Sequence, residues 1–456
     1  MNLYGKWEYK MEALLASLAA LFGSWSTLGV MIFCLMLCFL LGMPIFSSLA
    51  VSTVLGLLHG GSLPLSVIHN SLFEGLNIFP LLAIPCFVIA GSLMEHGNIT
   101  QQIIDVVKQV AGRAYGGLGI TTILGCTFFA AISGSGPGTV AAVGTLLIPA
   151  MVRNGYSKTY AASVASSGGT IGILIPPSNP MIIYAIICNL SVTAMFTAGF
   201  VPGFTVAFAM IITAWLIAKK QGFRGDDSTP PFNPGTFLRS CVKGGPALAT
   251  PFIILGSIYT GYATPVEASV VAIVWAVFVG VVVNRALRPR HFYTALLEGA
   301  SVCGAVLLIV GTSTLFGRLL TFLEAPQHLA VAVLSISNNP NVVLLMIIGV
   351  LIILGMFMET LSTIIILAPV LLPVLYALRI DPIHFGIILV VTNEMALLTP
   401  PVGVNLFVAS SLARIPIEKV AVGVLPYLAA LLICILLFTF FPEYVLWLPK
   451  LTGHLR

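Results

Sequence analysis

The chain has 456 residues, of which 58% are hydrophobic and 8% are charged, and its mean hydropathy is +1.07. A soluble domain carries about 25% charged residues because water must wet its surface. This composition therefore excludes an ordinary soluble globular protein and indicates a chain that lies mostly in lipid. The formal net charge is +5, and the sequence lacks the basic, aromatic-interleaved patch that nucleic-acid binding requires, so no nucleic-acid partner is expected.

The chain begins with a short stretch that precedes the first long apolar run. Lys6 and Lys10 are followed by an amphipathic segment, and we expect residues 1–23 to form an interfacial extension. The first apolar run, near 22–41, is too long for the core of a signal peptide and lacks an A-x-A-type cleavage site. We therefore expect a retained membrane helix there.

Apolar runs follow one another along the rest of the chain. Crossing the hydrocarbon layer takes about 20 residues; several runs reach that length, and shorter ones come in pairs around a polar, glycine-rich or acidic turn. The sequence predicts an all-α polytopic membrane protein. Its helices are expected near 22–42, 44–58, 76–94, 117–132, 139–151, 158–190, 193–218, 246–262, 265–284, 296–317, 341–357, 362–377, 384–412 and 420–441.

The sequence repeats itself at an offset of 224 residues, the difference between positions 298 and 74. The matching pairs are Glu74-Gly75 with Glu298-Gly299, Thr139 with Thr363, Pro149 with Pro373, and Pro176-Pro177 with Pro400-Pro401. One gapless offset held over about 100 residues indicates an internal repeat. We predict a first repeat over 24–218, a linker over 219–245, a second repeat over 246–441 and a tail over 442–456.

The distribution of Lys and Arg predicts the orientation of the two repeats. The linker carries Lys219, Lys220, Arg224, Arg239 and Lys243, and Arg285, Arg288 and Arg290 follow two helices later. The positive-inside rule places both stretches in the cytoplasm. The short pair at 117–151 then enters and leaves on the cytoplasmic side as a re-entrant hairpin, whereas the matching pair at 341–377 opens to the opposite side. Inverted repeats of this kind are typical of secondary transporters.

Two interruptions in the first repeat carry oxygen-rich sequence. The hairpin turn reads Ser133-Gly-Ser-Gly-Pro-Gly-Thr139, and Pro176-Pro177 breaks the helix over 158–190. Unpaired backbone inside a membrane is tolerated only where protein, water or an ion satisfies it, and exposed oxygens suit Na⁺. The helix that restarts at 137–139 favours a carboxylate at its positive end. The alternative is a proline kink with small residues for close packing.

The second repeat has matching interruptions that contain two acidic residues. Glu359 lies at the turn of the hairpin over 341–377, and Glu394 lies in the broken helix over 384–412. Carboxylates within a membrane are energetically unfavourable and usually functional; a structural role, in which they accept hydrogen bonds from unwound backbone, and a proton-relay role both stay open. Glu74 and Glu298 lie near predicted helix ends, where we expect caps or anchors.

Other chemistry has little support in the sequence. The eight cysteines lie mostly in apolar runs without a CxxC pair, and the seven histidines are dispersed without metal-ligand spacing. No GxxxxGK[ST] loop for ATP is present. We therefore expect a transporter and not an enzyme.

Five segments resemble the large (M, DctM-type) membrane subunit of tripartite ATP-independent periplasmic (TRAP) transporters, and the resemblance runs from about residue 24 to the C-terminus. The segments are FFAAISGSGPGTVAAVG (128–144), SSGGTIGILIPPSNPMIIYA (166–185), YTGYATPVEASVVAIV (259–274), MFMETLSTIIILAPVLLPV (356–374) and TNEMALLTPPVGVNLFVASSLA (392–413). The chain departs from the family at Gly136 and Gly138, where other members often carry Ser or Ala.

The resemblance implies partners and a mechanism. It implies a bacterial inner-membrane protein that works with a small four-helix membrane subunit and receives its substrate from a periplasmic substrate-binding protein. Import would be coupled to a Na⁺ gradient by an elevator-type movement of the domain that holds both hairpins. The implied substrates are carboxylates such as C4-dicarboxylates, sialic acid and other sugar acids.

The resemblance also implies two or more Na⁺ ions and their ligands. The first ion would be bound by Ser133, Ser135, Gly172, Ile175 and Pro176. The second would be bound by Gly355, Thr360, Asn393, Ala396 and Thr399. The substrate would be bound by Ser135, Gly136, Thr139, Ser178, Asn179 and Asn405.

Two other functions compete with the TRAP-type importer. A stand-alone Na⁺/carboxylate symporter of the wider ion-transporter class would share the hairpins and the proline-broken helices. A channel or a non-transporting scaffold belongs to another class: a channel needs a continuous polar stripe along several helices, which the sequence lacks, and a scaffold does not need two repeat-related interruptions.

Overall fold

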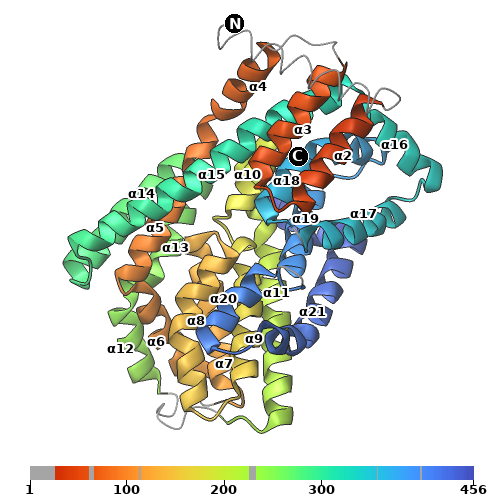
Figure 1. The fold of residues 1–456 in the computed structure, drawn as a ribbon. Helices are drawn as coiled ribbons and strands as arrows, with labels where there is room; N and C mark the ends of the chain where they lie inside the picture. Colours follow the sequence, from red (N-terminus) through yellow and green to blue (C-terminus); the bar gives the residue numbers. More distant parts are fainter. Residues whose placement is uncertain are drawn as a thin grey trace, which may run out of the picture. The chain divides into compact units, whose positions relative to one another are not determined.

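The structure is a computed structural model that describes residues 26–60, 66–111, 114–224, 233–356, 358–400 and 403–455. Every regular element within these ranges is a helix (Figure 1), which confirms the all-α prediction. The extension predicted over 1–23 lies outside the described residues.

Many of these helices are long enough to cross a lipid bilayer. Among the described residues, seven helices have the length and apolar composition of a membrane span, or nine if each of two bent helix pairs forms one span. The longest are α11 (Val192–Gln221) and α15 (Pro289–Phe322), with 30 and 34 residues. Because about 20 residues span the hydrocarbon layer, the chain is a multi-pass membrane protein.

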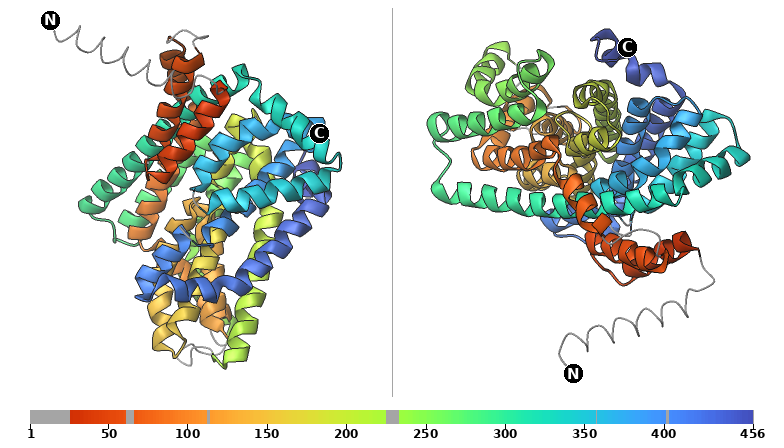
Figure 2. Two further views of the ribbon diagram at one scale, coloured as in Figure 1. Left: turned by 45° about the vertical axis from the view of Figure 1, so that its right-hand side comes forward. Right: turned by 90° about the horizontal axis from the view of Figure 1, so that it is seen from above.

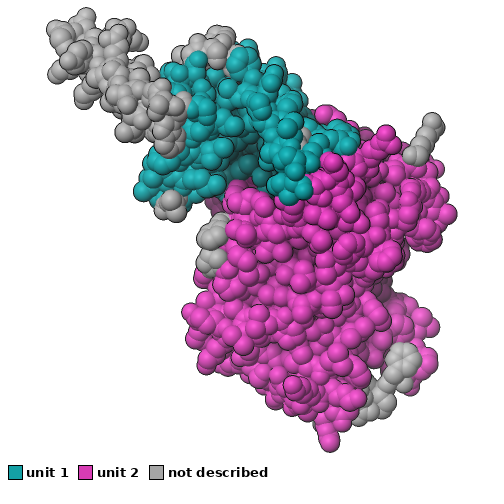
Figure 3. Space-filling model, turned by 90° about the vertical axis from the view of Figure 1, so that its right-hand side faces the viewer, with its two compact units in different colours: residues 1–78, 304–336, 365–377 teal, residues 79–303, 337–364, 378–456 magenta. Residues whose placement is uncertain are grey.

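The described chain divides into two compact units (Figure 3). Unit 1 takes its residues from 1–78, 304–336 and 365–377, and unit 2 from 79–303, 337–364 and 378–456. Helices α15 and α18 (Thr360–Ala377) each contribute residues to both units. The predicted second hairpin is therefore divided between the units, whereas the first lies wholly in unit 2.

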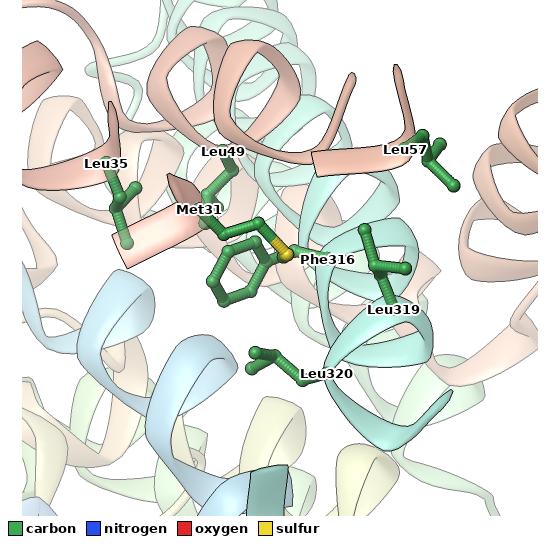
Figure 4. Close-up of a cluster of buried hydrophobic side chains, with 7 residues drawn as sticks. All are labelled: Met31, Leu35, Leu49, Leu57, Phe316, Leu319 and Leu320. Carbon is green, nitrogen blue, oxygen red and sulfur yellow. The ribbon is translucent and has the colours of Figure 1, made fainter. Parts of the chain in front are cut away.

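Unit 1 is built around one apolar cluster, shown in Figure 4. Besides its parts of α15 and α18, its helices are α2 (Thr27–Leu40), α3 (Ile45–Gly60), α4 (Ser66–Leu76) and α16 (Ala325–Ile336). The cluster consists of Met31, Leu35, Leu49, Leu57, Phe316, Leu319 and Leu320. Spacings of three, four and eight residues place the members from one helix on the same face, so α2, α3 and α15 pack through these side chains.

Two further contacts join the helices of unit 1. The Ser52 hydroxyl of α3 donates to the Met31 carbonyl of α2 at 2.7 Å. Arg318 of α15 donates to the Ser71 hydroxyl of α4 at 3.0 Å and forms an ion pair with Glu74. Glu74 therefore anchors one helix to another, as the sequence predicted.

Unit 2 contains the remaining helices. Besides α11 and its parts of α15 and α18, they are η1 (Phe79–Leu82), α5 (Ala83–His96), α6 (Ile99–Ala111), α7 (Gly117–Ser133), α8 (Gly136–Arg153), α9 (Lys158–Gly169), η2 (Thr170–Ile173), α10 (Asn179–Ile187), α12 (Pro234–Lys243), α13 (Gly245–Tyr259), α14 (Pro265–Phe278), η3 (Val279–Val283), α17 (Pro340–Gly355), α19 (Pro382–Leu397), α20 (Val404–Ala413), α21 (Ile417–Phe440) and α22 (Pro442–Leu451). Figure 2 shows the helices of the chain from two further sides.

The packing of unit 2 brings segments from both sequence repeats together. Helices α7, α8 and α9 pack against one another, and α20 packs against both α8 and α9 (Figure 1). Helix α17 packs against α19, and α11 packs against α21. Residues separated by more than 250 positions in the sequence therefore meet where the helices are interrupted.

The range predicted as a linker contains one further helix. Within 219–245, α11 continues to Gln221 and α12 begins at Pro234. The side chain of Asn233 caps α12 by accepting a hydrogen bond from the Gly235 N–H at 2.8 Å. Pro234 suits the first helical position, because an N–H group at that position would have no partner within the helix. Residues 225–232 lie outside the described ranges.

Candidate functional site

The glycine-rich segment at 133–139 forms the turn between α7 and α8. Gly134 ends α7 with a φ of +60°, a left-handed conformation that glycine adopts without steric penalty. The Ser135 hydroxyl caps α8 by accepting from the Gly138 N–H at 3.4 Å, and the Ser135 carbonyl accepts from the Thr139 hydroxyl at 2.7 Å. The N-terminal end of α8, with its partial positive charge, therefore lies at this turn.

The break between α9 and α10 lies against the same turn. The Asn179 N–H at the start of α10 donates to the Gly134 carbonyl at 3.4 Å. Ser178 caps α10 through its side chain, and the preceding Pro176–Pro177 peptide bond is cis. The hairpin and the broken helix therefore form one local structure.

Gly172 is a point of close approach between the break and the turn. A Cβ atom at this position would lie 2.7 Å from the Ser135 carbonyl oxygen and 2.6 Å from Thr139 Oγ1. Such contacts are shorter than van der Waals separation, so a side chain would push the two segments apart. Glycine at 172 is what allows the backbone of the break to reach the cap of α8.

The second broken helix has a corresponding contact with the end of α17. A Cβ atom at Gly355 would lie 2.6 Å from Ala396 Cβ and 3.2 Å from Asn393 Oδ1. Helix α19 ends at Leu397, and α20 begins after Gly403, whose φ is +47°. Two residues predicted to bind the second ion, Asn393 and Ala396, therefore meet a third, Gly355.

Several buried polar atoms around these interruptions lack a hydrogen-bond partner. A polar atom stranded in this way costs about 1–3 kcal/mol, and native structures contain few of them. Their concentration at the two breaks is therefore what an ion- or ligand-binding site requires. They are Ser167 Oγ, Asn179 Oδ1, Thr360 Oγ1, Ser362 Oγ, Thr392 Oγ1 and the side-chain N and O atoms of Asn393, Glu394 and Asn405.

A cavity of about 500 Å³ opens at these interruptions, within unit 2. Its lining includes the turn from Ser133 to Gly138, together with Asn179, Glu359 and Thr360. Cavities of this size hold small organic ligands. Since Ser135 and Glu359 line the same space, the turns of both predicted hairpins meet at one cavity.

The cavity combines a positive helix end with acidic side chains. Its lining includes four glutamates: Glu95 of α5, Glu298 of α15, Glu359 just before α18, and Glu394 of α19. Its described lining contains no Lys or Arg. An anion is stabilised at the N-terminus of α8, whereas the carboxylates require a cation nearby. The geometry therefore suits an organic anion that binds together with small cations.

The structure gathers most of the predicted first ion site. Ser133 and Ser135 lie at the hairpin turn, where a Cβ at Gly138 would be 3.2 Å and 3.4 Å from their hydroxyl oxygens, and Gly172 contacts the Ser135 carbonyl. Ile175 and Pro176 follow in the same break, and the Ile175 side chain lies against Gly203 of α11. The assignment of all five as ligands stays a prediction.

The remaining predicted residues are distributed between the cavity and the interior. In the second ion set, Thr360 lines the cavity, whereas the Thr399 hydroxyl donates to the Met395 carbonyl at 2.9 Å. In the substrate set, three residues line the cavity and three are fully buried. The lining residues are Ser135, Gly136 and Asn179, and the buried ones are Thr139, Ser178 and Asn405.

The sequence did not predict that Glu298 lines the cavity. Glu298 was expected near a helix end, but it lies within α15 and lines the cavity, so that expectation was wrong. Its repeat partner Glu74 lies in unit 1, and the pairing at 224 residues gave no sign that the two would differ. The prediction began the helix that contains Glu298 at 296, where the apolar run starts. The structure begins α15 at Pro289, with polar residues in its first turns, so Glu298 lies well inside the helix.

The fold and the site together define a helical membrane transport protein, and comparison with known proteins is more specific. The chain matches the family "Tripartite ATP-independent periplasmic transporter, DctM component" over residues 32–444. It is 39% identical to the C4-dicarboxylate TRAP transporter large permease protein DctM of Pseudomonas aeruginosa, over 84% of this chain and 89% of that one. It is 35% identical to the sialic acid TRAP transporter large permease protein SiaM of Vibrio cholerae, over 90% and 95%.

A longer relative and a solved structure extend the comparison. The chain is 39% identical to the isethionate TRAP transporter permease protein DctMQ of Oleidesulfovibrio alaskensis, over 88% of this chain but only 63% of that protein's length. The crystal structure of the YdaH transporter of Alcanivorax borkumensis has a similar fold, with a TM-score of 0.60 and 15% identity over 83% of this chain and 89% of that one.

This chain belongs to the DctM family and is a large permease subunit of a TRAP transporter, as its sequence predicted. It is a multi-pass protein of the bacterial inner membrane and not an enzyme.

Proposed function

We propose that this subunit imports a small organic anion, a carboxylate such as a C4-dicarboxylate or a sugar acid, together with Na⁺. The observation that carries the proposal is the group of unpartnered buried oxygens beside the N-terminus of α8, at a cavity of about 500 Å³. Hard cations prefer such oxygen ligands, and the positive helix end accepts a carboxylate.

The proposal assigns each predicted ion set to one break. The first ion is bound at the turn of α7 and α8, where Ser135 and Gly172 meet, and the second where Gly355 meets Asn393. Each ion lies where a helix ends beside an interruption: the first at the end of α7 and the start of α8, and the second at the end of α17 beside α19. The substrate lies in the cavity between the two ions, and their charge offsets that of its carboxylate.

The proposed architecture is a pair of inverted repeats with re-entrant hairpins, moving as an elevator. The sequence offset of 224 residues and the Lys and Arg distribution support inversion. The meeting of both hairpin turns at one cavity supports a midplane site. A movement that carries this cavity across the membrane would expose it to each side in turn.

The proposed partners are a small four-helix membrane subunit and a periplasmic substrate-binding protein, as the tripartite family description implies. Reconstitution with components omitted tests this. The subunit pair is placed in proteoliposomes with an inward Na⁺ gradient, and uptake of radiolabelled succinate, N-acetylneuraminate and isethionate is measured with each cognate binding protein and without one. Uptake is expected only with the binding protein and the small subunit present. Equal uptake by the large subunit alone would support the stand-alone symporter instead.

A further inference from the structure

Glu394 is a fully buried carboxylate, and the described cavity lining around it contains no Lys or Arg. It lies within α19 with a relative exposure of 0%, and neither of its carboxylate oxygens has a hydrogen-bond partner. A buried carboxylate without a donor or a counter-charge is strongly unfavourable. A bound cation or a proton must therefore neutralise it.

The surroundings of Glu394 supply further oxygen atoms and a space. A Cβ atom built at Gly136 would lie 3.2 Å from Glu394 Oε2, 3.3 Å from the Gly169 carbonyl oxygen and 3.4 Å from Asn405 Oδ1. These oxygens come from three different helices, α19, α9 and α20, and they converge beside the start of α8. The absence of a side chain at Gly136 leaves the space between them open.

Asn405 cannot be satisfied by ordinary contacts either. Its exposure is 0%, and both of its side-chain polar atoms lack a hydrogen-bond partner although the amide faces Glu394. Asn405 is not part of the described cavity lining, and its predicted role in substrate binding stays a prediction. Its side chain is a second unpartnered group directed at the same point as Glu394.

The enclosure of this point limits what can bind there. Neither Glu394 nor Asn405 exposes surface to a water-sized probe, although Glu394 belongs to the cavity lining. A substrate group or a hydrated ion would therefore have to displace protein atoms to enter. The described cavity lining contains no Lys or Arg to reach the carboxylate. A dehydrated monatomic cation can take Glu394 Oε2, Asn405 Oδ1 and the Gly169 carbonyl oxygen as ligands at once. The Asn405 amide N–H group is not a cation ligand and is left to face the Glu394 carboxylate.

We propose that Glu394 and Asn405 bind Na⁺ in the space beside Gly136, with the Gly169 carbonyl as a further ligand. This site shares no residue with either predicted ion set, so it is an additional one. The inference rests on the proposed Na⁺ coupling of transport. Because its ligands come from α9, α19 and α20, an ion bound here holds both broken helices against the first hairpin.

Equilibrium binding of radioactive Na⁺ to the purified complex with its small subunit tests the site without requiring transport. Glu394→Gln removes the charge. Gly136→Ala places a methyl group in the space between the three oxygens, 3.2–3.4 Å from each of them, so that the ion no longer has room. Gly136 is at the helical start of α8, so alanine fits its backbone. Both variants are expected to bind one Na⁺ fewer per chain than the wild type.

Matched controls separate the site from general effects of the same substitutions. Glu418→Gln makes the same chemical change at an exposed position of α21, and Gly256→Ala adds a methyl group where no atom lies within 4 Å. Both are expected to bind as many Na⁺ as the wild type. If Glu394→Gln does not assemble with the small subunit, Gly136→Ala alone decides the question.

Three results have distinct meanings. An unchanged Na⁺ count in both Glu394→Gln and Gly136→Ala overturns the proposal and indicates that the Asn405 amide is rotated to donate to Glu394. An unchanged count together with loss of substrate-induced proton movement in Glu394→Gln also overturns it, because the carboxyl then holds a proton. If the wild type itself binds no Na⁺, the proposed coupling fails along with this site.

Discussion

At the scale of single residues, the site combines buried oxygens that lack a hydrogen-bond partner with oxygens that cap a helix. The Ser135 hydroxyl and carbonyl already serve the start of α8, so a Na⁺ ion there would share them with the helix. The sequence showed that the turn and the proline break each expose oxygen, and the resemblance to the TRAP family grouped Ser133, Ser135 and Gly172 in one ion site. The sequence did not predict that Asn405 faces Glu394, since that contact depends on how α20 packs against α8 and α9.

Removal of both hairpin hydroxyls tests the first ion site. In Ser133→Ala/Ser135→Ala, each lost hydroxyl is expected to weaken ion binding by about 1–3 kcal/mol, and each loss corresponds to a Na⁺ affinity about 5- to 150-fold lower. Transport should fail at physiological Na⁺ and recover in part when Na⁺ is raised. The loss of the Ser135 cap should lower stability by only about 1 kcal/mol.

The control for this double variant is Ser335→Ala, at an exposed hydroxyl that donates to its own helix. It should leave the Na⁺ dependence of uptake unchanged. If the double variant also shows the Na⁺ dependence of the wild type, the two serines are packing residues and the first ion site lies elsewhere.

At the scale of helices, the apolar runs predicted where most elements lie. The two interrupted runs at 158–190 and 384–412 appear as α9, η2 and α10, and as α19 and α20. Helix α12 was not expected, because its hydrophilic surroundings read as a linker and only the Asn233 cap and Pro234 indicate a helix start. Single glycines, Gly172 and Gly355, allow each break to approach a neighbouring segment closely. The sequence alone could not predict this, because the neighbours of each glycine are set by tertiary packing.

Substitution of one of these glycines tests the contact between the first hairpin and the first break. In Gly172→Ala, the added Cβ would lie 2.7 Å from the Ser135 carbonyl oxygen, and the two segments must separate. Overpacking of this kind costs about 1–3 kcal/mol, so thermal unfolding should occur at a lower temperature and uptake should be lost. Gly256→Ala, in open surroundings, should change neither; equal behaviour of the two variants would show that the contact is not needed.

At the scale of the whole molecule, the repeat and the charge distribution predict an inverted topology. A membrane-impermeant thiol reagent tests it in a background without the eight native cysteines. Arg285 and Asn338 are both exposed, and the prediction places them on opposite sides of the membrane. Asn338→Cys should react in intact spheroplasts, whereas Arg285→Cys should react only after permeabilisation. Labelling of both in intact spheroplasts would contradict the inversion.

The central claim is that Na⁺ drives import through the cavity of unit 2. The most direct measurement is uptake of the transported anion into proteoliposomes that contain the complete complex, with the same inward gradient formed by either Na⁺ or K⁺. The account predicts accumulation above the external concentration with Na⁺ and none with K⁺, because the oxygens at the two breaks must be filled before the cavity moves. Equal accumulation with the two cations would contradict it.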